Sequence, residues 1–177
     1  VRGGWLCRKT AEAFARFAGM MAAHFSGRVS HFITLNEPQI VLKLGYADGI
    51  HAPGKRLSLP GLVSCWKNLM LAHGLSFRAI RQAAPDAKVG IASTGKLCYP
   101  HSPADETAAR LETFRLSDSD WMFTHPIVLD AVCLGRVEPE GGRLRELLST
   151  VTPEEWDTMH AVPDFIGINS YNGSEIA

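Results

Sequence analysis

The chain alternates between segments with the periodicity of helices and segments with the composition of buried strands. Apolar side chains recur every three to four positions in residues 10–25 and 62–82, which predicts two long amphipathic helices. Apolar, partly β-branched runs predict three short strands at residues 29–35, 88–93 and 165–168. Strands that alternate with covering helices are typical of a parallel sheet. We therefore expect an α/β fold.

Two further helices are predicted from their start signals. Ser102-Pro103 joins a capping hydroxyl to a proline at the first helical position. Thr152-Pro153 repeats the pattern, and Glu155 is placed to complete a capping box. The stripes expected to face the core are Phe14, Phe17, Ala18, Met21 and Phe25 on the first long helix, and Leu62, Trp66, Leu69, His73, Phe77 and Ile80 on the second.

Composition is that of an ordinary globular protein and argues against some partners. Of the 177 residues, 46% are hydrophobic and 20% are charged, and the formal net charge is zero. There is no long run of one charge, so nothing indicates a surface for nucleic acid or an anionic membrane. No apolar stretch reaches the roughly 20 residues that span a bilayer. We expect neither nucleic acid nor membrane as a partner.

The four cysteines, Cys7, Cys65, Cys98 and Cys133, are widely separated and form no Cys-x-x-Cys pair. We interpret them as buried thiols of a reducing compartment, which favours a cytoplasmic location over a disulfide framework. The chain opens at Val1 rather than at a methionine, so the lack of a signal peptide is uninformative. The seven histidines lack metal-ligand spacing, and we predict neither a metal nor a cofactor.

The first predicted strand stops abruptly at Asn36, Glu37 and Pro38. Proline cannot extend a central strand, and it favours β or polyproline geometry for Glu37. In parallel α/β proteins, polar groups at the carboxyl ends of strands line the ligand crevice. A carboxylic acid beside an amide there suits general acid/base chemistry on a polyhydroxylated substrate. From the residues alone, the alternative that Asn36 and Glu37 only close the strand as turn residues stays open.

Thr34-Leu35-Asn36-Glu37-Pro38 resembles the signature of glycoside hydrolase family 1, the β-glucosidase and 6-phospho-β-glucosidase family. Other segments resemble that family in the same order along the chain: Gly3-Gly4-Trp5-Leu6, residues 45–54, the histidine-containing residues 68–74, and residues 164–171. The resemblance implies a (β/α)₈ barrel, with the three predicted strands as strands four to six. Such a barrel typically needs about 250 residues. We therefore expect residues 1–177 to be the central segment of one barrel domain, without its first three and last two strands.

The resemblance also implies roles for four residues. A retaining glycosidase needs two carboxyl groups roughly 5 Å apart, one to protonate the leaving oxygen and one to attack the anomeric carbon. By resemblance, Glu37 is the general acid/base and Asn36 bonds the sugar 2-hydroxyl. Asn169 and Tyr171 are placed at the end of strand six, where the tyrosine hydroxyl would hold the nucleophile carboxylate. The implied substrate is a β-glucoside or a related oligosaccharide.

Two features of this site are open at the level of sequence. Strand alternation would point Asn36 and Glu37 to opposite faces, so both reach one sugar only if the strand end bends or bulges. The family's Thr-Glu-Asn-Gly-like nucleophile motif is missing, because Glu138, Glu140, Glu146, Glu154, Glu155 and Glu175 lack its flanking residues. Ser170 also stands where the family usually has an aromatic residue. We therefore expect the nucleophile outside this chain, and no activity from the chain alone.

Several alternatives accompany this interpretation. His51 could border the leaving-group side of the site, but a turn-stabilising role is favoured, and His73 on an apolar helical face is expected to be a core histidine. The main functional alternative is an inactive barrel segment that retains partial sugar binding or pairs with another chain. An unrelated α/β domain without a carbohydrate role is a weaker alternative. The sequence predicts no oligomeric state.

Overall fold

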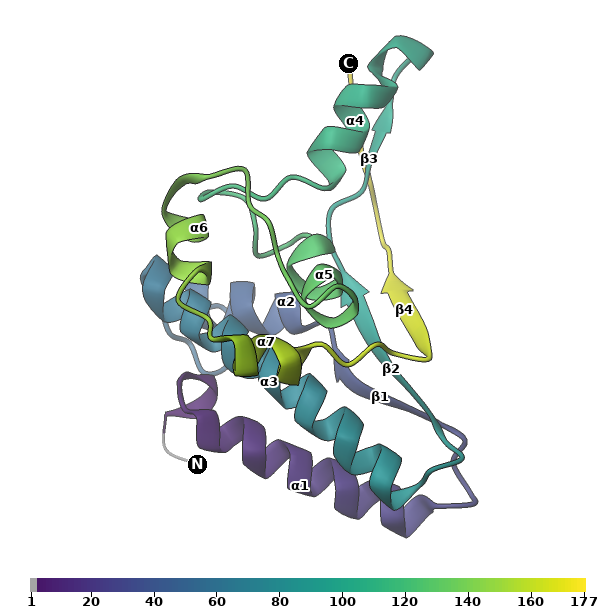
Figure 1. Cartoon of the computed structure of the whole chain (residues 1–177). Coiled ribbons are helices and arrows are strands. Elements are labelled where there is room, and N and C mark those ends of the chain that lie inside the picture. The colour runs from purple at the N-terminus through teal and green to yellow at the C-terminus, as the bar shows by residue number, and fades with distance from the viewer. Residues whose placement is uncertain (1–2) are drawn as a thin grey trace.

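The structure, a computed structural model, describes residues 3–177 and contains a three-stranded parallel sheet (Figure 1). The strands lie in the order β1, β2, β4 and span His31–Asn36, Lys88–Thr94 and Phe165–Asn169. The three predicted strands and the α/β class are therefore confirmed. Because the strands are parallel, their carboxyl ends meet at one edge of the sheet, and this edge carries the site described below.

Helices pack against this sheet and against one another. Figure 1 shows α1 (Arg8–Phe25), α3 (Leu59–Ala83) and α7 (Pro153–Met159) to one side of the strands, together with α5 (Pro126–Cys133) and α6 (Gly142–Leu148). Trp66 in α3 is almost fully buried, and its indole N–H donates to the Ile127 carbonyl of α5 over 2.8 Å. α3 contacts α1, α5, α6 and α7, so it is the central helix of the hydrophobic core.

The predicted stripe of α1 is wrong at Phe17, and its other members are half-buried rather than buried. The buried residues of α1 are Ala11, Ala15 and Ala22, whereas Phe17 is 55% exposed. Small side chains at a helix contact let the two axes approach closely, so the alanines turn inward and Phe17 turns to the surface. The predicted stripe of α3 is confirmed, because all its members except the half-buried Phe77 are buried.

Gly74 in α3 allows α7 to pack directly on the helix backbone. A Cβ at this position would lie 1.7 Å from the Thr158 carbonyl oxygen, so no larger residue fits without moving α7. α7 itself begins with the predicted capping box, in which the Thr152 Oγ1 accepts from the Glu155 amide and the Glu155 carboxylate accepts from the Thr152 amide. The capping box of Thr152 and Glu155 thus sets the start of α7, and Gly74 allows α7 to pack closely on α3.

Short elements link β1 to α3. After β1 the chain forms α2 (Pro38–Ile40) and the π-helical segment η2 (Val41–Ala47), and η1 (Gly4–Leu6) precedes α1. The buried Tyr46 hydroxyl in η2 accepts from the Trp5 amide over 2.9 Å. A Cβ on Gly4 would lie 2.5 Å from that hydroxyl, so the glycine leaves room for this contact.

A small unit projects beyond the carboxyl edge of the sheet (Figure 1). In it, β3 (Cys98–Pro100) and β5 (Ser174–Ile176) pair in parallel, and η3 (Pro103–Asp105) leads into α4 (Glu106–Thr113). Ser102 and Asp105 form a capping box, which confirms the predicted helix start. The sequence does not predict β3, β5, α5 or α6, because elements this short carry too little periodicity.

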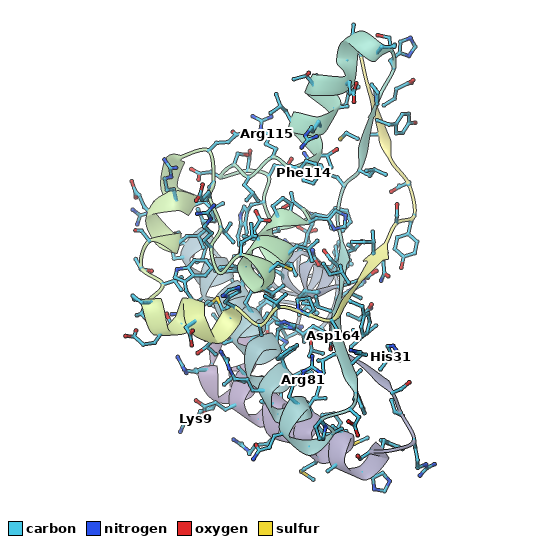
Figure 2. The ribbon with its side chains drawn as sticks, turned by 45° about the vertical axis from the view of Figure 1, so that its right-hand side comes forward. Lys9, His31, Arg81, Phe114, Arg115 and Asp164 are labelled. Carbon is cyan, nitrogen blue, oxygen red and sulfur yellow. The ribbon has the colours of Figure 1, made fainter. Side chains whose placement is uncertain are left out.

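An ionic contact closes the amino-terminal end of the sheet. Figure 2 shows Arg81 and Asp164 there, and the guanidinium Nη2 lies 2.6 Å from both carboxylate oxygens of Asp164. Asp164 also accepts from the Val89 amide over 2.7 Å. The Val89 amide first, and then Arg81, hold the pKa of the Asp164 carboxyl below its ordinary value. Together these contacts tie α3, β2 and the start of β4 to one another.

The two edge strands leave apolar side chains in solvent. Ile33 of β1 is 50% exposed, and Ile166 and Ile168 of β4 are 44% and 55% exposed. In the central strand, by contrast, every residue after Lys88 is buried. The helices of the described chain therefore cover the middle of the sheet better than its edges.

All four cysteines are free thiols. Cys65 and Cys98 are buried as predicted, whereas Cys7 and Cys133 are only half-buried. Burial raises the pKa of the Cys65 thiol to about 11. Among residues 3–177, no helix combines the length and the hydropathy needed to cross a bilayer.

Candidate active site at the carboxyl edge of the sheet

β1 ends before Glu37 as predicted, but the backbone of Glu37 is not extended. Its φ and ψ are 50° and 57°, in the left-handed region, so the expected β or polyproline geometry is wrong. The Glu37 amide donates to the Ala92 carbonyl over 2.9 Å, and the Glu37 carbonyl accepts from the Ile40 amide over 2.9 Å. Pairing with β2 and the following turn thus impose a conformation that local sterics disfavour before a proline.

A bulge distorts the end of β1. Ile33 pairs with Gly90 and Asn36 pairs with Ala92, so β1 uses one more residue than β2 over this interval. Thr34 and Leu35 are accordingly both buried, although neighbouring residues in a regular strand face opposite sides. The bulge that a shared role of Asn36 and Glu37 requires is therefore present.

The site residues expected from the sequence come together at this edge. Asn169, the last residue of β4, donates from Nδ2 to Glu37 Oε1 over 2.7 Å and to Asn36 Oδ1 over 3.1 Å. The Tyr171 hydroxyl donates to the same Glu37 oxygen over 3.1 Å. One amide thus orients the carboxyl and the amide of the β1 end relative to each other.

The contact of Tyr171 differs from the one implied by the resemblance. Its hydroxyl was expected to face a nucleophile carboxylate, and it bonds Glu37 instead. The hydrogen bond to Glu37 and the charge of that carboxylate raise the pKa of Tyr171. Tyr171 is 81% exposed, so this bond is open to solvent.

A buried polar network behind Glu37 was not predicted from the sequence. Gln39 in α2 is 1% exposed, and its Nε2 donates to Ser93 Oγ over 2.7 Å and to the Thr124 carbonyl over 3.2 Å. Its Oε1 accepts from the Thr94 amide over 3.5 Å. Ser93 Oγ continues the network to His125 Nδ1 over 2.9 Å. A glutamine after a proline carries no sequence signal of such contacts, which depend on where β2 and the chain before α5 lie.

His73 is a satisfied core histidine, as predicted. It is fully buried, with Nδ1 2.7 Å from Thr34 Oγ1 and Nε2 3.1 Å from the Ala161 carbonyl. Burial is the main cause that lowers its pKa from 6.5 to about 4, so the ring is neutral near pH 7. A carbonyl can only accept, so Nε2 carries the proton and Nδ1 is left as an acceptor facing the Thr34 hydroxyl, which also lies 3.2 Å from the Gly90 carbonyl. His73 thus supports β1 from behind.

His51 lies in an exposed turn after η2. The His51 amide donates to the Leu44 carbonyl over 3.0 Å, and the His51 carbonyl accepts from the Gly54 amide over 2.7 Å. A Cβ on Gly45 would lie 2.8 Å from the Ala52 carbonyl oxygen, so the glycine permits the loop to fold back. These contacts place the backbone of His51 in the turn, in line with the favoured interpretation.

Five of the six other glutamates considered as nucleophiles are engaged away from Glu37. Glu155 lies 2.8 Å from Lys67 Nζ and also caps α7. Ion pairs join Glu138 to Arg136, Glu140 to Arg115 and Glu146 to Arg143, and Glu175 Oε1 lies 3.0 Å from His101 Nδ1. Within residues 3–177, none of these glutamates bonds Asn36, Glu37, Asn169 or Tyr171. The described site therefore contains one carboxyl group.

Comparison with known proteins identifies relatives along the whole chain. The profile of glycosyl hydrolase family 1 matches residues 1–177. Beta-glucosidase A of Acetivibrio thermocellus is 33% identical over 178 aligned residues, covering 99% of this chain and 38% of that protein. Beta-glucosidase A of Thermotoga maritima is 29% identical over 177 aligned residues, covering 98% and 38%.

A solved structure agrees with these relatives. Virulence factor SghA from Agrobacterium tumefaciens, in complex with its substrate analog salicin, superimposes with a TM-score of 0.80 at 29% identity. The match covers 99% of this chain and 37% of the SghA chain. The chain thus spans about two fifths of the length of the proteins it matches. On this evidence, the chain belongs to glycosyl hydrolase family 1.

Proposed function

We propose that residues 1–177 act as the central part of a retaining β-glucosidase-type barrel, with Glu37 as the general acid/base. The observation that carries the proposal is the Asn169 amide, which bonds both Glu37 and Asn36 from a strand more than 130 positions away. A half-exposed carboxyl with an oriented amide beside it is the arrangement needed to protonate a leaving oxygen while the sugar is held.

The hydrogen bonds suggest which carboxyl oxygen carries the proton. Asn169 and Tyr171 both donate to Oε1 of Glu37, so that oxygen acts as an acceptor. In the acid form the proton therefore belongs on Oε2, which we assign to the glycosidic oxygen of the substrate. After the aglycone leaves, the same carboxylate takes a proton from water in the second step. We assign Asn36 to the sugar 2-hydroxyl, where a bond strengthens as positive charge develops on the sugar.

Tyr171 fits a role on the second carboxyl group. A hydroxyl has one proton, so Tyr171 cannot donate to Glu37 and to a nucleophile at the same time. We assign it to the nucleophile in the complete site, with its exposed bond to Glu37 exchanging for that partner. The nucleophile and the other sugar contacts would come from parts of the barrel beyond these residues. The exposed isoleucines on β1 and β4 support such an extension, since neighbouring barrel elements would cover them.

β-Glucosides are the proposed substrate class. The support is the relatedness to several β-glucosidases and the likeness to SghA, whose complex holds its substrate analog salicin. The comparison favours no particular aglycone.

The decisive experiment substitutes Glu37 in the full-length enzyme. Glu37→Gln should abolish hydrolysis of alkyl β-glucosides, whose leaving group needs a proton, but should spare glycosylation by dinitrophenyl β-glucoside. Azide should then restore turnover, because a small anion attacks the glycosyl-enzyme without help from a base. Glu146→Gln, at an exposed ion pair, is the matched control and should behave as wild type. Equal losses on both substrates without azide rescue would remove Glu37 from this role.

A further inference from the structure

The turn that presents Glu37 is held against its local preference. Residues other than glycine rarely adopt left-handed backbone angles. A following proline also disfavours helical angles for the residue before it. Such a conformation persists only where surrounding contacts determine it. The backbone bonds of Glu37 reach Ala92 and Ile40. The other strong anchor of this turn is the side chain of Gln39, two residues along.

Gln39 is fixed in one orientation by its partners. The Thr124 carbonyl can only accept a hydrogen bond and the Thr94 amide can only donate, so Nε2 must face Thr124 and Oε1 must face Thr94. The side chain is 1% exposed, so water cannot replace these partners. Gln39 therefore joins the turn after β1 to the end of β2 and to the chain before α5.

The hydrogen bonds of Gln39 continue to a second side chain. Ser93 Oγ accepts from Gln39 Nε2 over 2.7 Å, and it lies 2.9 Å from His125 Nδ1. Ser93 is fully buried, and both of these residues contact its hydroxyl. A change at Ser93 therefore removes one of the bonds that hold Gln39 without touching the turn itself.

We propose that Gln39 is a positioning residue for Glu37, acting through the turn that Pro38 and Gln39 form. α2 is a single short turn, so a displacement of Gln39 passes to the backbone of Glu37 and moves its carboxyl relative to Asn36 and Asn169. The inference rests on the proposed acid/base role of Glu37. It adds that the orientation of the Glu37 carboxyl group depends on the buried side-chain amide of Gln39, which does not contact that carboxyl group.

The test compares two substrates in the full-length enzyme carrying Gln39→Met, which keeps the side-chain volume and removes the hydrogen bonds. The readout is the ratio of kcat/KM for dinitrophenyl β-glucoside to kcat/KM for an alkyl β-glucoside. A displaced Glu37 carboxyl group slows only the cleavage of the alkyl β-glucoside, whose leaving group needs protonation. The ratio should therefore rise by about 10- to 100-fold, as expected for a displacement near 1 Å. Loss of folded enzyme lowers both values equally and leaves the ratio unchanged.

Further variants make the outcome unambiguous. Ser93→Ala removes one partner of Gln39 and should raise the ratio by about fivefold; it carries the test if Gln39→Met does not fold. Ser76→Ala is the matched control, because Ser76 is a fully buried serine in α3 whose hydroxyl lacks a hydrogen-bond partner in the described chain. An unchanged ratio in Gln39→Met and Ser93→Ala, with a raised ratio in Glu37→Gln, would overturn this inference alone. An unchanged ratio in Glu37→Gln would overturn the proposed function as well.

Discussion

Acidification should destabilise this protein through His73. The ring is fully buried and neutral, with its pKa lowered from 6.5 to about 4, mainly by burial. The unfolded chain binds a proton near pH 6.5, whereas the folded chain resists binding until about pH 4. The contribution of His73 to the free energy of unfolding is therefore fully present above pH 6.5 and is lost as the pH falls from 6.5 to 4.

The size of the effect follows from the two pKa values. Linkage gives a fall in the free energy of unfolding of about 2 kcal/mol between pH 7 and pH 5, and of about 3 kcal/mol once the pH is below 4. Typical domains have only about 5–15 kcal/mol of stability, so this is a large share. Burial also lowers the pKa of His125, and its contribution has the same sign.

Urea unfolding followed by tryptophan fluorescence can isolate the His73 contribution, because Trp66 and Trp121 are both buried. His73→Gln should lower stability at pH 7, since it disturbs two buried hydrogen bonds, by about 1–3 kcal/mol. Its stability should then depend less on pH than that of wild type, and His125 cancels in the comparison. Thr34→Ser keeps the hydroxyl that faces His73 and should retain the wild-type dependence.

A parallel loss of stability in wild type and His73→Gln would contradict this prediction. If wild type and His73→Gln lose stability in parallel between pH 7 and pH 5, the folded His73 takes up its proton as readily as the unfolded one. The ring would then be hydrated or able to leave its site between Thr34 and Ala161. A nitrogen-15 titration of the His73 ring should agree, with no protonation until the pH approaches 4.

Two further predictions concern packing and catalysis. Gly74→Ala should lower the free energy of unfolding by about 3 kcal/mol, because the new Cβ meets the Thr158 carbonyl, which cannot rotate away; an unchanged urea midpoint would show that α7 does not lie this close. The 177-residue chain alone should turn over an aryl β-glucoside no faster than its Glu37→Ala variant, because a retaining reaction needs a second carboxyl group roughly 5 Å away. Turnover that this substitution removes would place the nucleophile within these residues.

Elements whose signals are local could be predicted from the amino-acid sequence. The end of β1, the caps of η3 and α7, and the buried stripe of α3 follow from side-chain chemistry within a few residues. The pattern of Thr34 to Pro38 likewise indicated a polar end on a buried strand and a resemblance to one enzyme family. The stripe of α1 was misjudged at Phe17, because hydrophobicity ranks phenylalanine above alanine whereas close contact with α3 favours small residues.

The assembly of the site, by contrast, depends on contacts between residues that are distant in sequence. The left-handed turn at Glu37 and the bulge before it depend on hydrogen bonds to β2, which lies more than 50 positions away in the chain. The buried bonds of Gln39 and the bridge from Asn169 to Glu37 depend on the order and register of three strands. A hydrogen bond needs its partner within about 3 Å, and a residue's own neighbours in sequence do not specify which distant strand will supply that partner.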